Sequence, residues 1–149
     1  MATKAVNGIT IEMTAEEEAA YIASLTQTLE EVRASKLNEV TALRKQYEQG
    51  GISFAGATVG TDKEDQAAIN QVLTVLTLAQ TDMDYPNYID FKAGSTFVTI
   101  DYATASALSK AVANHVQACF TAEKAHYAAI NALTEYADIE AYDVTTGWV

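Results

Sequence analysis

The chain repeats one local pattern three times: a stretch that favours β structure, a polar residue that can cap a helix, and an alanine-rich helix. The β-prone stretches cover residues 8–13, 56–60 and 96–100, and they are followed by Thr14, Thr61 and Asp101. Thr and Asp suit helix N-caps because their side-chain oxygens accept hydrogen bonds from backbone N–H groups that a helix leaves unpaired. The copies are unequally spaced and their side chains agree loosely, which argues against a solenoid. The pattern predicts an α+β fold dominated by helices.

Two of the predicted helices are long. Residues 15–49 contain no helix breaker before Gly50-Gly51, so one continuous helix of about 50 Å is expected. The last helix is expected from residue 102 to about residue 136, with one further helical turn in the segment after it. Between the long helices, residues 62–80 are apolar on most sides, so this helix is expected to be the most buried. Thr14 with Glu17 and Thr61 with Glu64 have the spacing of capping boxes.

These elements predict a three-helix bundle, with two long helices flanking a shorter one and small β-hairpins at the helix junctions. Asn7-Gly8 lies between β-prone residues and is a strong hairpin signal. Ala55-Gly56 and residues 92–95 hold the same position in the later copies. We divide the chain into an N-terminal hairpin leader, residues 1–14, and one helical domain, residues 15–149.

Charge and hydropathy exclude two classes of partner. Twenty Asp and Glu residues against nine Lys and Arg give a formal net charge of −11. Nucleic-acid binding needs basic residues to neutralise phosphates, and an anionic membrane surface would repel this chain. No apolar stretch reaches the roughly 18–20 residues of a membrane span, and the first residues lack the apolar core of a signal peptide. We expect no binding to nucleic acid or membrane.

A metal site is the first chemical hypothesis to weigh. His115, Cys119 and His126 share one face of the last predicted helix, and Glu123 lies between the second and the third of them. The first two supply only two zinc ligands, and His126 lies about 10 Å further along the axis. We therefore interpret this face as packing or as an inter-subunit contact, and we predict no metal and no cofactor.

Nucleophilic catalysis is the second chemical hypothesis to weigh. Cys119 is the only cysteine, with His115 four residues before it, but no strand-to-helix elbow or oxyanion nest accompanies the pair. Asp82, Asp84 and Asp90 lie in and beside a turn-rich connector and are interpreted as solvated rather than as calcium ligands. We predict a buried, inert thiol, no catalytic residue and no enzyme activity.

Six residues are candidates for an interface. A seam of apolar side chains runs along the first long helix and slips out of phase near Lys36. A helix with so narrow a seam must pack against other helices or against copies of itself. The connector adds aromatic side chains, which are common at interfaces. The candidates are Ile22, Leu25, Leu29, Val32, Tyr85 and Tyr88.

Several segments of the chain match a known pattern. They are residues 50–54, 61–62, 97–100, 111–120 and 147–148, and the first long helix leads into them. From about residue 29 to residue 148 the chain resembles an uncharacterised domain of tailed-bacteriophage proteins, which is often encoded in or beside tail-fibre genes. Residues 6–18 resemble the short leader of such proteins. That family has no defined catalytic residues, so none is carried over.

The resemblance implies a structural component of a phage tail, a fibre-associated or adaptor protein that takes part in tail assembly and host adsorption. Its partners would be other tail proteins and copies of itself, with a trimer favoured because phage fibres are usually three-fold. It would be assembled in the host cytoplasm and reside in the virion. The alternative is a fibre-assembly chaperone that is not retained in the virion.

Overall fold

The computed structural model describes residues 3–6, 9–25 and 28–149, and helices dominate them. The helices are α1 (Ala15–Leu25), α2 (Leu29–Glu48), α3 (Lys63–Leu78), α4 (Tyr102–Ala132) and α5 (Tyr136–Ala141). The strands are β1 (Thr3–Val6), β2 (Ile9–Glu12), β3 (Ile52–Phe54), β4 (Ala57–Val59), β5 (Ile89–Ala93) and β6 (Thr96–Ile100). The predicted helix-dominated α+β class is confirmed.

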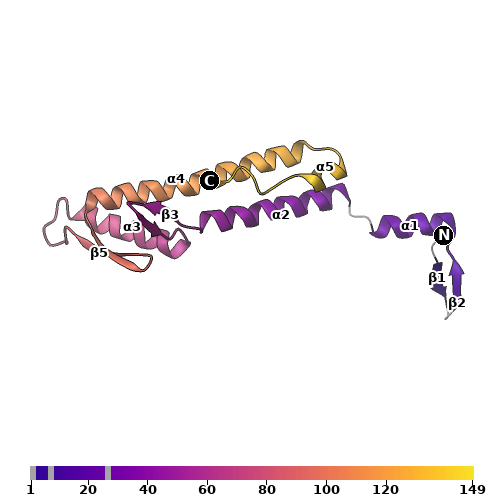
Figure 1. Ribbon diagram of the computed structural model, residues 1–149, viewed down its shortest axis with the longest axis horizontal. Helices are drawn as coiled ribbons and strands as arrows, with labels where there is room; N and C mark the ends of the chain where they lie inside the picture. The colour runs from indigo at the N-terminus through magenta and orange to yellow at the C-terminus, as the bar shows by residue number, and fades with distance from the viewer. Residues whose placement is uncertain (1–2, 7–8, 26–27) are drawn as a thin grey trace.

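Helix α4 is the longest helix, and helices α2 and α3 pack along it (Figure 1). Helix α2 packs along the C-terminal half of α4, and α3 packs along its N-terminal half. The short helix α5 folds back against α2. Helix α3 therefore does not lie between two long helices. It buries only Ile69 and Leu76, whereas α4 buries six residues, so the prediction that α3 is the most buried helix is wrong.

The first predicted helix is interrupted. Helix α1 ends at Leu25 and α2 begins at Leu29, so the expected continuous helix over residues 15–49 is wrong. Thr28 is the N-cap of α2: its hydroxyl accepts from the Glu31 N–H at 3.2 Å, and its own N–H donates to the Glu31 carboxylate at 2.7 Å. This capping box satisfies two backbone donors at a new helix start.

The other caps are partly as predicted. Thr14 and Glu17 form the expected box at the start of α1, and Asp101 caps α4. Asp62, not Thr61, caps α3. The fully buried Thr61 hydroxyl instead donates to the Glu48 carbonyl at 2.5 Å and accepts from the Gly51 N–H. Thr61 thus ties the end of α2 to the start of α3.

Each predicted hairpin is present as a two-stranded antiparallel sheet, β1–β2, β3–β4 and β5–β6. Ala55 and Gly56 have φ of 50° and 83°, as a tight hairpin turn that matches strand twist requires. Gly94 has φ of 58° in the β5–β6 turn. The Asn7-Gly8 turn prediction lies outside the described residues.

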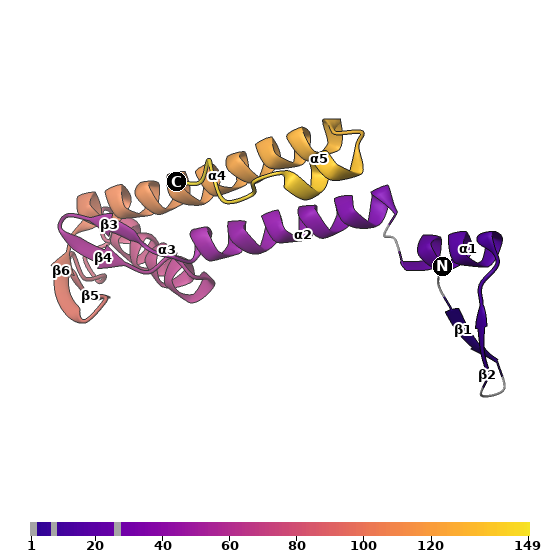
Figure 2. The ribbon, with the colours of Figure 1, turned by 45° about the vertical axis from the view of Figure 1, so that its right-hand side comes forward.

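The core consists of three clusters along α4. One joins α2, α4, α5 and the C-terminal segment through Val32, Val40, Ile130, Ile139 and Val144. The other two join α3 and α4 to the β3–β4 and β5–β6 hairpins. In both views α1 and the β1–β2 hairpin lie beyond the N-terminal end of α2, and the other two hairpins lie at the opposite end (Figures 1 and 2). None of the described helices is long and apolar enough to span a membrane.

Candidate interaction surfaces

Two of the predicted interface residues belong to the core of their own chain. Val32 is only 5% exposed and packs with Ile130 and Ile139, and Leu29 packs against the same cluster. This part of the seam is covered by α4 and α5 of the same chain. The prediction that Leu29 and Val32 face a partner is therefore corrected, because the chain folds back on them.

The remaining predicted interface residues are divided between the two ends of the molecule. Ile22 is 56% exposed on α1, and the side chain of Leu25 lies outside the described residues. Tyr85 and Tyr88 are exposed in the connector between α3 and β5, and Tyr88 is 65% exposed. The structure does not bring the six residues into one surface.

Exposed apolar side chains occur on the end of α3, on the connector that follows it, on β6 and on the first turn of α4, and we name them together the distal surface. Met83 is 98% exposed and Phe97 is 71% exposed. Tyr88 and Tyr102 line one shallow pocket together. The distal surface comprises Leu78, Met83, Tyr85, Tyr88, Phe97 and Tyr102. The sequence analysis identified the two connector tyrosines but not Phe97. A signal was present, because Phe97 and Val98 are adjacent apolar residues and must lie on opposite faces of the strand.

Carboxylates near the distal surface make separate local hydrogen bonds. Asp82 accepts from the Asp84 N–H, and Asp90 accepts from the Thr99 hydroxyl at 2.6 Å. Asp101 accepts from the Thr104 N–H at 2.8 Å, and this bond holds the pKa of Asp101 below its ordinary value. These bonds account for the carboxylates as turn and cap residues.

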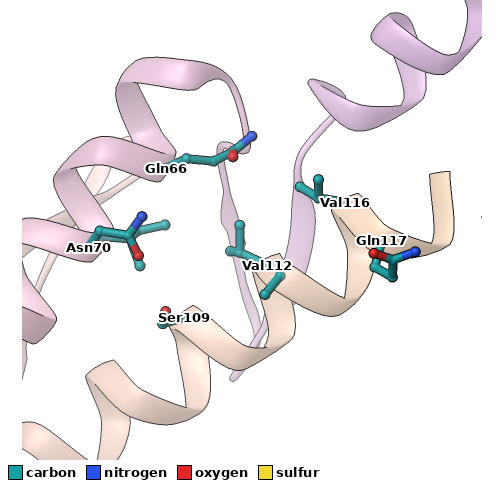
Figure 3. A pocket seen from close by; sticks show the side chains of 8 residues that line it. Gln66, Asn70, Ser109, Val112, Val116 and Gln117 are labelled. Carbon is teal, nitrogen blue, oxygen red and sulfur yellow. The ribbon is translucent and has the colours of Figure 1, made fainter. Parts of the chain in front are cut away.

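A hollow of about 260 Å³ lies between α3 and α4 (Figure 3). Its apolar lining includes Ile69, Val112 and Val116, and polar side chains surround them. Those polar residues are Gln66, Asn70, Ser109 and Gln117. They offer neutral hydrogen-bond donors and acceptors. Its lining residues include no charged side chain and no general base beside the Ser109 hydroxyl, so the hollow is suited to packing or binding.

A buried charge network joins α2 to α4. The Arg44 guanidinium pairs with Glu48, lies 2.9 Å from the Glu123 carboxylate through Nε, and sits 4.4 Å over the Phe120 ring. Glu123 also accepts from the Thr41 hydroxyl at 2.8 Å. Because unpaired buried charges are costly, this network favours one register of α2 against α4.

His115 and Cys119 do not form an activated nucleophile. The His115 Nε2 lies 3.0 Å from the Tyr47 carbonyl, to which it must donate, and 3.9 Å from the Cys119 sulfur. A nitrogen that donates its proton cannot accept one from the thiol. Cys119 is fully buried, and burial raises the pKa of its thiol.

His126 holds the C-terminal segment. Its Nε2 donates to the Thr146 carbonyl at 2.9 Å, and its Nδ1 lies 2.9 Å from the Tyr142 hydroxyl. The Trp148 ring stacks between His126 and Tyr47. Within the described ranges, no group of three or more His, Cys, Asp and Glu side chains is placed to hold a metal ion.

Comparison with known protein families matches most of the chain. Residues 31–146 match the model of a family described as a domain of unknown function, DUF4376. No curated protein matches the chain. No solved structure matches it either. The matched segment starts within α2 and includes α3, α4, α5 and the two hairpins between them. Because it covers well over half of the sequence, the chain belongs to the DUF4376 family.

Proposed function

We propose that the protein is a structural component of a bacteriophage tail, a fibre-associated or adaptor protein that takes part in tail assembly and host adsorption. The resemblance of residues 29–148 to a domain of phage tail-fibre proteins suggests the setting. The structural observation that supports an adaptor is the separation of two exposed regions by a packed body. The α1 region, with exposed Tyr21 and Ile22, lies at one end, and the distal surface lies at the other.

An adaptor needs a stiff body between its attachment points. The α2–α4 pair supplies one, because Arg33 donates to the carbonyls of Ile130 and Leu133 and the Arg44 network links the same helices. Such a body keeps the α1 end of the molecule apart from the distal surface. The partners would be other tail proteins, with further copies of this chain in a trimer.

Mass spectrometry of purified particles tests the proposal. A tail component is expected in virions at a stoichiometric ratio to known tail proteins. Its consistent absence from virions, together with its presence in infected cells, would contradict the structural role and favour a fibre-assembly chaperone. Particles grown without the gene serve as the control, since the peptides of this chain must disappear from them.

An enzyme is the competing class, and Cys119→Ala separates it from a scaffold. A hydrolase that used this thiol would lose its activity. A scaffold would lose only part of its stability, because the fully buried thiol acts as a small apolar group. Adsorption by virions that carry Cys119→Ala should therefore equal that of wild type, and a loss of adsorption without unfolding would contradict this.

A further inference from the structure

Strand β6 has an open edge. Its pairing partner among the described strands is β5 alone, in a register that places Ala93 opposite Thr96 and Phe91 opposite Val98. The two-residue connection makes Ala93 and Thr96 a hydrogen-bonded pair, so the backbone groups of Phe97 and Thr99 point away from β5. These groups can pair with a further strand.

Nothing in the sequence of β6 blocks such pairing. Natural edge strands are protected by charged side chains, proline or bulges. Residues 96–100 read Thr-Phe-Val-Thr-Ile, without a charge or a proline. The four residues from Thr96 to Thr99 are exposed. This strand is therefore an accessible template for main-chain hydrogen bonds.

An apolar cavity of about 160 Å³ lies beside this edge, between the β3–β4 hairpin, the β5–β6 hairpin and α4. Val98 lies on the same face of the sheet as Phe91, and both line the cavity. Val98 is nevertheless 36% exposed, so solvent reaches this lining side chain from the β6 strand. An apolar cavity of about 150 Å³ accommodates a molecule as large as benzene, so this one can take one branched or aromatic side chain.

The charge around this site favours a basic occupant. Asp90 lies across from Thr99 on β5, Asp101 follows β6 directly, and Lys92 is the one basic residue of the hairpin. The whole chain carries a net charge of −11, which disfavours a second copy in this position. Complementary charge speeds association and selects partners.

We infer that β6 and the cavity beside it bind an extended segment of a partner protein. The segment adds as a third strand to the β5–β6 sheet and inserts one side chain of leucine or phenylalanine size into the cavity. It carries Lys or Arg that face Asp90 and Asp101. In this binding mode main-chain hydrogen bonds supply affinity and a side-chain pocket supplies specificity. The inference does not depend on the proposed phage role.

A synthetic peptide tests the site on the full chain. The probe is acetyl-Lys-Thr-Val-Leu-Val-Thr-Lys-amide, and the control peptide has Asp in place of the central Leu. Titration monitored by amide NMR should shift Phe97 and Thr99 and slow their hydrogen exchange with the probe only. No binding at millimolar peptide, or equal binding of both peptides, overturns the inference.

Two variants separate the edge from the cavity. Thr99→Pro removes an N–H that points away from β5, and Thr99→Val is its matched control. Thr104→Leu fills the cavity from α4, and Thr104→Ser is its control. Each test variant should weaken binding roughly tenfold or more, with β5 amide shifts reporting that the hairpin still folds. Unchanged affinity in both overturns the inference. The inference is also overturned if the protein forms a dimer in which the Phe97 amide is protected from hydrogen exchange without peptide, because a second copy would then occupy the edge.

Discussion

Asp101 shows how one side chain fixes the start of the longest helix. Its carboxylate accepts from the Thr104 N–H at the first turn of α4, and the Thr104 backbone bond is the main cause of its lowered pKa. Because the helix N-terminus favours negative charge, the ionised form caps best. A carboxyl whose pKa is lower in the folded state stabilises the fold above its unfolded pKa, and it loses that contribution as the pH falls through the folded value.

Asp101→Asn tests this dependence, because asparagine caps a helix but does not titrate. Near neutral pH the wild type should be more stable than Asp101→Asn. The difference should persist down to the ordinary aspartate pKa of 3.8 and shrink as the pH falls further. Thermal melts between pH 7 and pH 2, followed by circular dichroism, measure it. A difference that grows on acidification would contradict the assigned cap.

The tertiary contacts of single residues could not be predicted from the sequence. The sequence showed that Thr61 and Asp62 lie at a helix start, but both can cap. The choice depended on Thr61 finding partners ten or more residues away, at Gly51 and Glu48. The Phe120 contact of Arg44 is likewise set by helix pairing across most of the chain. Such partners follow from tertiary packing, which local spacing does not specify.

At the scale of elements, local sequence signals correctly predicted the features that depend on local hydrogen bonds. The hairpins and the caps at Thr14 and Asp101 are as expected. The break before α2 carried a signal too, since Thr28 and Glu31 repeat the Thr14–Glu17 spacing. This signal is weak, because no glycine or proline accompanies it. The extent to which α3 is buried could not be predicted from local signals. It depends on how the helices pack, and α2 and α3 contact different halves of α4 instead of packing on either side of one another.

The two parts of the apolar seam should respond differently to substitution. Val32 is in the core between α2, α4 and α5, so Val32→Ser should lower the free energy of unfolding by about 2 kcal/mol or more. Urea unfolding followed by circular dichroism measures this. Asn38→Ser, on the exposed side of α2, is the matched control and should change little. If Val32→Ser left stability unchanged but dissociated an oligomer, the seam would be an interface after all.

At the scale of the whole molecule, the shape follows from one long helix with partners arranged along it. Because α2 and α3 each cover a different length of α4, the body becomes elongated rather than compact (Figure 1). The α1 region projects from one end and the distal surface forms the other. An elongated body with dissimilar ends suits a connection between different partners, and the fold class alone did not predict this arrangement.

The assembly state tests how the α1 end is used. We expect a homo-trimer, with a mass three times the 16.0 kDa of one chain in size-exclusion chromatography with light scattering. Ile22→Ser should shift the mass toward the monomer while helix content is retained, because the Ile22 side chain is more than half exposed on α1. Met83→Ser changes a more exposed apolar residue at the opposite end and should leave the mass unaltered. A wild-type protein that remains a 16.0 kDa monomer and binds no other tail component would defeat both the trimer and the adaptor role.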